Sequence, residues 1–213
     1  MNKSYIQRQG YRLITVKSFF IMKMQSFTFH LLDKKKQHTN KKTNCLGDDM
    51  KILSNDMVSQ DRLISFFEEY CGDNLMVVSS GTYVLSKLPG FVAIKSDKIV
   101  AAMTYCLKGS ILEIISLDSI EENKGIGSKL IQQIEMVANE LGSKAIQVIT
   151  TNDNLRAIAF YQKRGFRFNQ IFTDAVKVAR HIKPSIPLYA DNGLPIRDEI
   201  LFIKKVKFND DSE

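Results

Sequence analysis

The chain has 213 residues, of which 44% are hydrophobic and 25% are charged, values typical of a globular protein with one substantial core. Its formal net charge of +7 comes from the start of the chain. Residues 1–47 carry ten Lys or Arg against the single acid Asp33, whereas residues 48–213 carry twenty Lys or Arg against twenty-two Asp or Glu. The larger part is thus slightly acidic, which argues against a nucleic-acid-binding face.

The cysteines and histidines exclude two further kinds of site. Cys45, Cys71 and Cys106 are odd in number and widely spaced, which is typical neither of a disulfide framework nor of a zinc site. The three histidines are isolated from one another in the sequence. We therefore expect a reducing compartment, the cytoplasm, and no bound metal.

Residues 1–49 form a basic segment that we expect to be a disordered leader. Before Asp33 it has five Lys or Arg and no acid, a composition that resembles an organellar transit peptide. Two lysines interrupt its apolar run, which disfavours a membrane-spanning helix. The preferred alternative is an upstream extension outside the natural product, with the functional chain beginning at Met50 or Met57. Import into an organelle would follow only from a genuine leader.

The first half of the remaining chain predicts one helix and then antiparallel strands. Residues 57–70 carry apolar side chains at helical spacing, and 75–79 form a short β-rich run. The runs 91–95 and 99–106 flank a turn and read as a hairpin. A further turn leads into the apolar strand 111–119. Together these segments predict an antiparallel meander.

The second half alternates helices and strands, which predicts an α/β fold around a mixed sheet. Two of its helices end at glycines, Gly142 and Gly165, as expected for helix C-termini. The expected helices are 126–141, 154–164 and 175–182, and the expected strands are 145–150, 166–172 and 198–206.

A glycine-containing turn precedes the helix that begins at residue 126. A helix start exposes unpaired backbone N–H groups at the positive end of the helix dipole, and such groups hold a pyrophosphate without side-chain charge. The chain has no Gly-Lys-Ser or Gly-Lys-Thr, and Leu130 is too large for a dinucleotide fingerprint. The residues predicted to form this cradle are Asn123, Lys124, Gly125, Ile126, Gly127 and Ser128.

A second motif lies on the next predicted helix. Asn154 begins it, Tyr161 follows at a helical spacing, and Gly165-Phe166 ends it. Tyr161 supplies a hydroxyl group that suits a proton donor, although an amphipathic core tyrosine is the alternative. The two motifs together predict a coenzyme A site with a proton donor beside it.

These motifs resemble the GNAT superfamily of acetyl-CoA-dependent N-acetyltransferases. The resemblance runs from about residue 52 to 206 and is strongest over 111–168. It implies a mixed, mostly antiparallel central sheet with helices on both faces, in which the fourth and fifth strands, 111–119 and 145–150, splay apart. The N-acetyltransferase domain would then span 50–207, followed by an acidic tail at 208–213.

The resemblance also implies roles for particular residues. The 123–128 turn would hold the pyrophosphate of acetyl-CoA, although Glu122 stands where the family has Arg or Gln. Asn154 would contact the pantetheine arm, and Tyr161 would protonate the departing thiolate. The backbone of the fourth strand would pair with the pantetheine at Leu117, Asp118 and Ser119.

Glu113 stands four residues before this contact, where some relatives carry a catalytic base. A carboxylate in an apolar strand is costly to bury unless it is paired or functional. We therefore expect Glu113 to act as the general base, or else to pair with a nearby Lys or Arg.

The predicted function is the transfer of an acetyl group from acetyl-CoA to an amine by direct attack in a ternary complex. The alternative is a non-catalytic acyl-CoA-binding or regulatory module with the same fold. We expect a small-molecule or peptide amine as the partner, and neither nucleic acid nor membrane. The sequence leaves the identity of the amine, the acyl chain length and the oligomeric state open.

Overall fold

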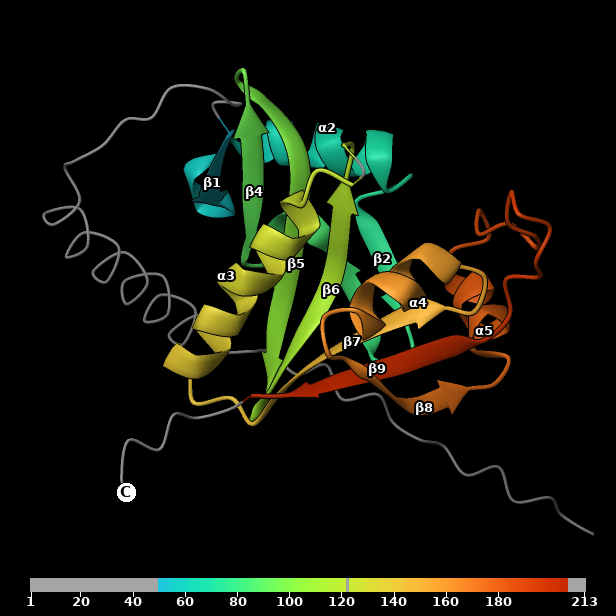
Figure 1. The fold of residues 1–213 in the computed structure, drawn as a ribbon. Helices are drawn as coiled ribbons and strands as arrows, with labels where there is room; N and C mark the ends of the chain where they lie inside the picture. Colours follow the sequence, from blue (N-terminus) through green and yellow to red (C-terminus); the bar gives the residue numbers. More distant parts are fainter. Residues whose placement is uncertain (1–49, 122, 207–213) are drawn as a thin grey trace, which may run out of the picture. The chain divides into compact units, whose positions relative to one another are not determined.

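The computed structural model describes residues 50–121 and 123–206 (Figure 1). The predictions for the leader 1–49, for Glu122 and for the tail 208–213 lie outside the described residues. None of the helices in the described part is long and apolar enough to cross a membrane.

Seven strands form the central sheet in the order β1-β4-β5-β6-β7-β9-β8, and β2 and β3 form a separate hairpin. Only the β6–β7 pair is parallel within the described sheet. The expected mixed, mostly antiparallel sheet is confirmed. The strands are β1 (Met50–Ser54), β2 (Leu75–Val78), β3 (Gly81–Val84), β4 (Gly90–Lys95), β5 (Lys98–Lys108), β6 (Ile111–Ser119), β7 (Ala145–Thr151), β8 (Arg167–Phe172) and β9 (Glu199–Lys205).

The helices follow the predicted pattern with shifted ends. The first begins three residues later than expected because Val58 and Ser59 are extended. The sequence pattern also missed the short strand β3, whose four residues carry too weak an alternation to stand out. The helices are α2 (Gln60–Tyr70), α3 (Ile126–Glu140), α4 (Leu155–Gln162) and α5 (Ala175–Ile182), with short 3-10 helices at Asn55–Met57 and Leu85–Lys87.

Helices cover both faces of the sheet, as expected. On one face α3 buries Leu130 and Ile134 completely, four residues apart on one side of the helix. On the other face α2 buries Phe66 and Phe67 against the sheet. Each such side chain contributes about 1.5–3 kcal/mol of transfer free energy, so the two apolar layers fix the helices to the sheet.

The parallel strands β6 and β7 separate along their length. They pair from Ile111–Ala145 to Ile114–Val148 and no further, although β6 continues to Ser119. At the point of separation β6 has a bulge at Ile115, an extra residue relative to β5. The predicted splay is thus present, and it leaves one backbone edge of β6 without a strand partner.

The β2–β3 hairpin lies on the same sheet face as α2 and contacts α5. Met76 and Tyr83 of the hairpin pack against the apolar cluster under α2. The hairpin and α5 therefore bound the space beside the splayed strands.

Candidate functional site

The turn before α3 presents a helix N-terminus without a side-chain cap. Gly125 is the N-cap residue and has φ +76°, a left-handed conformation that glycine adopts without a Cβ clash. The first hydrogen bond inside the helix runs from the Lys129 N–H to the Gly125 carbonyl at 3.1 Å. No hydrogen bond runs from the N–H groups of residues 126–128 to another described residue, and N–H groups at the positive end of a helix suit an anion.

The second glycine of the motif has a different role. A Cβ atom on Gly127 would lie 3.0 Å from the Phe160 ring, so this glycine lets α4 pack closely against α3. Arg164 stacks on the same ring at 3.4 Å and donates a hydrogen bond to Ser128 Oγ. The Ser128 side chain is therefore engaged, and its backbone N–H is the group left for a ligand.

The end of β6 offers backbone groups to the gap. Leu117, Asp118 and Ser119 pair with β5 on one edge, while the edge toward β7 has no strand partner. The Asp118 side chain lies near the Cys71 thiol, and its pKa is raised because burial outweighs the hydrogen bond from Cys71. The Asp118 side chain is thus engaged with Cys71, and the backbone of residues 117–119 faces the gap.

Tyr161 is 5% exposed and lies among the rings of Phe160, Phe166 and Phe202. Its hydroxyl has no hydrogen-bond partner among the described residues. Burial, assisted by the negative charge of Asp118, raises the pKa of the phenol. The hydroxyl therefore stays protonated at neutral pH, which is the state that a proton donor needs.

Asn154 occupies the N-cap of α4. Its Oδ1 accepts a hydrogen bond from the Ala157 N–H at 3.0 Å, as is usual for a capping asparagine. The residue also lines a pocket of about 300 Å³ that reaches the splayed strands. A capping role is therefore established by geometry, and the contact with pantetheine stays a prediction.

Glu113 is 1% exposed, and both of its carboxylate oxygens have partners. One accepts a hydrogen bond from Ser80 Oγ, and the other lies 2.7 Å from Gln147 Nε2 and 2.8 Å from Lys108 Nζ. Burial disfavours the charge of Lys108, but hydrogen bonds to Glu113 and Tyr83 outweigh it and raise the lysine pKa. The expected pairing with a Lys is present, and the role of Glu113 as a base stays a prediction.

The 300 Å³ pocket lies between β2, α5 and the diverging ends of β6 and β7. Ile115, the bulge residue, and Asn154 line it on the side of the gap. Most of the remaining lining is aliphatic, contributed by β2, α5 and the segment before β9. A chamber of this kind beside a helix start suits a small molecule with an apolar body.

Glu199 lines the same pocket and was missed in the sequence. It begins β9, is 2% exposed, and accepts a hydrogen bond from the Ser79 N–H at 2.7 Å. The signal was available: Glu199 precedes an apolar strand, as Glu113 lies within one, and a carboxylate there is costly to bury without a purpose.

Comparison with known proteins identifies the family and supports the fold. The sequence profile described as "Acetyltransferase (GNAT) family" matches residues 57–166. The chain belongs to this family. It is 46% identical over 159 residues to the uncharacterized protein YxbD of Bacillus subtilis (strain 168), covering 74% of this chain and all of the relative. It is 48% identical over 158 residues to the uncharacterized protein YdhI of the same organism, covering 74% and 99%.

Solved GNAT structures share the fold at low sequence identity. An acetyltransferase from Bacillus subtilis in complex with CoA has a TM-score of 0.55 at 18% identity, covering 75% of this chain and all of that one. A GNAT family acetyltransferase from Elizabethkingia anophelis with acetyl-CoA bound has a TM-score of 0.54 at 19% identity, covering 75% and 99%.

In this GNAT domain, side-chain contacts fix the segment between α5 and β9. Arg180 of α5 donates hydrogen bonds to the carbonyls of Ile186 at 3.0 Å, Pro187, and Ile196 at 2.6 Å. Ile186 and Ile196 both line the pocket. Through Ile186 and Ile196, the segment between α5 and β9 therefore borders the pocket.

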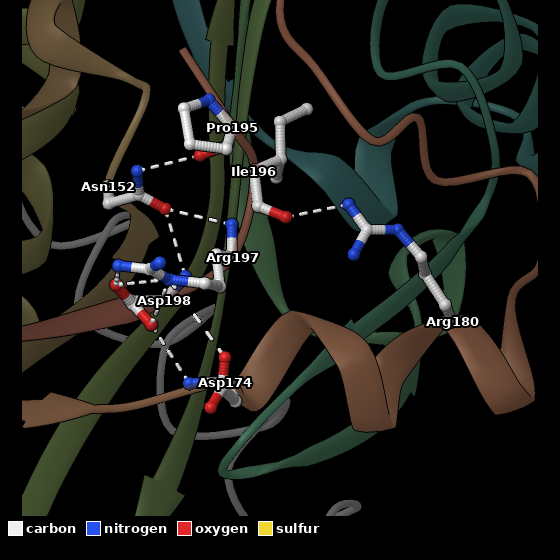
Figure 2. A network of polar contacts seen from close by, with 7 residues as sticks. All are labelled: Asn152, Asp174, Arg180, Pro195, Ile196, Arg197 and Asp198. Carbon is white, nitrogen blue, oxygen red and sulfur yellow. Dashed lines mark hydrogen bonds and ion pairs between the residues drawn. The ribbon is translucent and has the colours of Figure 1, made fainter.

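A second set of contacts, drawn in Figure 2, anchors the same segment to β7 and α5. The Asn152 side chain accepts from the N–H groups of Arg197 at 3.0 Å and Asp198 at 2.9 Å. The Asp198 carboxylate accepts from the Asp174 N–H at 2.9 Å and forms an ion pair with Arg197 at 3.1 Å. Glu199 is the next residue, so this network helps to fix the position of its backbone beside the pocket.

The predicted residues gather at one end of the sheet. Because β6 and β7 are parallel, both run toward the same end of the sheet. There β6 is followed by the start of α3, and β7 by the start of α4. Glu113 lies where β6 and β7 are still paired, and the adjacent residues Ser79 and Ser80 contact the two buried carboxylates, Glu199 and Glu113.

Proposed function

We propose that the protein is an N-acetyltransferase that moves an acetyl group from acetyl-CoA to an amine by direct attack in a ternary complex. The observation that carries the proposal is the separation of β6 from β7 beyond Ile114, with an uncapped helix start at the end of β6. Membership of the GNAT family and the CoA-bound state of two fold neighbours support the choice of co-substrate.

The residues present fit acetyl-CoA through their main chain. The N–H groups of residues 126–128 would hold the pyrophosphate, helped by the left-handed Gly125 that turns them outward. The free edge of β6 at 117–119 would pair with the pantetheine amides, and Asn154 lies across the gap at the start of α4. Lys124 and Asn123 belong to the same turn and would contribute through their backbone.

The chemistry requires a nucleophilic amine, a stabilised oxyanion and a proton for the departing sulfur. The amine nitrogen would bond to the thioester carbonyl carbon as the carbon–sulfur bond breaks. A backbone N–H near Leu117, beside the bulge, would stabilise the negative oxygen. Tyr161 would return a proton to sulfur, and the amine would lose one, to Glu113 in the sequence-based assignment. Positioning supplies much of the remaining acceleration.

The test combines binding and turnover with the full chain. Calorimetry should show one acetyl-CoA bound per chain, and a thiol-release assay across small primary amines and lysine peptides should show amine-dependent turnover. Failure to bind acetyl-CoA at millimolar concentration would remove the proposal. Binding without thiol release for every amine would favour the non-catalytic acyl-CoA-binding module instead.

A further inference from the structure

The pocket beside the splayed strands contains a carboxylate without a cationic partner. Glu199 is 2% exposed, and its one hydrogen bond among the described residues comes from the neutral Ser79 N–H. No Lys, Arg or His within the described residues forms an ion pair with it. A buried charge in this state is costly, because the hydrogen bond from one amide replaces little of its lost hydration.

The other ionisable groups of the lining do not compensate for this charge. Lys183 Nζ already pairs with Asp73 at 3.2 Å and donates to the Leu75 carbonyl at 3.0 Å. Burial and the nearby Asp118 raise the pKa of the Cys71 thiol, so Cys71 stays neutral. The chamber therefore presents an aliphatic wall with one carboxylate left for a ligand.

Glu113 provides the internal comparison. It is equally buried and sits on the same sheet face, but it has a lysine, an amide and a hydroxyl as partners, and it does not line the pocket. Both carboxylate oxygens of Glu113 thus have partners within the chain, whereas the Glu199 carboxylate at the pocket could accept further hydrogen bonds from a ligand.

We propose that Glu199 is the acceptor-binding residue, and that the acceptor is a small primary amine with an apolar body, which binds as its ammonium ion and must lose one proton before its nitrogen attacks the thioester. This inference rests on the proposed acetyl transfer, because it identifies the amine that the same site would accept. The ammonium group would pair with the Glu199 carboxylate, and the apolar body would lie against Val77, Val176 and Ile196. A volume of about 300 Å³ suits a metabolite-sized molecule rather than a folded protein surface.

Two matched probes separate charge recognition from a merely structural role. Phenethylamine is a cation at pH 7, whereas O-benzylhydroxylamine has nearly the same shape and remains neutral. We expect wild-type protein to acetylate phenethylamine, and the Glu199→Gln variant to raise its KM about 30-fold or more, as expected for loss of a buried charge pair. The KM for O-benzylhydroxylamine should change less than about threefold, because this probe has no charge to lose.

The glutamine substitution is suited to this test because its amide oxygen can still accept from the Ser79 N–H. Glu135→Gln is the matched control, because it removes a carboxylate on α3 that pairs with Lys204 of β9. It should leave both KM values unchanged. A structural role for Glu199 alone would raise both probes' KM values equally and would overturn the proposal.

A binding measurement covers the case in which neither probe turns over. Calorimetry of phenethylamine with the wild-type acetyl-CoA complex should give heat that Glu199→Gln abolishes. If phenethylamine does not bind at about 10 mM, ten times a typical millimolar KM, the inference is overturned. If acetyl-CoA itself fails to bind, the proposed function fails first, whereas turnover restricted to lysine peptides removes only the inference about the pocket.

Discussion

The two sides of the β6–β7 gap are built in different ways. On the cofactor side the contributing groups are backbone amides, from the end of β6 and the start of α3, and the residues involved are neighbours in sequence. On the proposed acceptor side a buried side chain, Glu199, is held by the backbone N–H of Ser79, 120 positions away in the sequence. If the proposed site is correct, cofactor binding would depend on local backbone conformation, whereas acceptor choice would depend on a few side chains from distant segments.

The largest expected effect is a loss of acetyl-CoA affinity. Gly125→Asp would put a carboxylate at the mouth of α3, where we expect it to weaken acetyl-CoA binding roughly 1,000-fold by like-charge repulsion. Gly125→Asn has the same shape and the same left-handed backbone demand without the charge, so it should retain most of the affinity. Calorimetry on the pair measures the difference, and equal losses would show that backbone conformation, rather than anion binding, is responsible.

Tyr161→Phe should affect turnover rather than binding. Removing a general acid should lower kcat about 100-fold while the Kd for acetyl-CoA stays within about twofold. Tyr105→Phe is the control, because Tyr105 is 6% exposed in the same apolar cluster and burial raises its pKa to about 12. Steady-state kinetics would contradict the assignment if both variants, or neither, lost kcat.

Glu113→Gln tests whether the second buried carboxylate works as a base or as an anchor. As a base, its loss should flatten the alkaline rise of the pH–rate profile. As an anchor for Lys108, its loss should instead lower the free energy of unfolding by about 2 kcal/mol, with the profile unchanged in shape. Thermal unfolding and pH–rate data on one preparation distinguish the two outcomes.

The smallest expected effect concerns the network that holds the acceptor side. Hydrogen bonds from Arg197 and from the Asp174 backbone lower the pKa of Asp198 below its ordinary 3.8. A lowered pKa means that the ionised carboxylate contributes stability above about pH 4 and that this contribution disappears as pH falls. Asp198→Asn should therefore cost less than about 1 kcal/mol at pH 7. Denaturant unfolding should show the difference from wild type narrowing below pH 4, and a constant difference would contradict the assignment.

The sequence predicted those elements whose signals are local. The range 175–182 for α5 agrees with the structure, and α3 differs by one residue, because helical periodicity marks such segments directly and Pro184 and Gly142 follow them. The short strand β3 was missed, since four residues in a hairpin provide little pattern. Gly127 shows a subtler limit: the motif pointed to a phosphate, but only the packed structure reveals the Phe160 ring beside it.

The candidate site shows the same division. The turn at 123–128 and Tyr161 could be located from spacing, and their roles stay predictions. The contacts of Glu199 with Ser79 and of Glu113 with Ser80 and Gln147 could not be predicted, because pairs of residues 33 to 120 positions apart leave no periodic trace in one sequence.

The β2–β3 turn has a consequence for divergence within the family. Its adjacent serines contact the two buried glutamates, and Met76, Val77 and Val78 of β2 line the pocket where we propose that the amine binds. If that proposal is correct, substitutions at Met76, Val77 and Val78 would change which amine is accepted without altering the turn before α3.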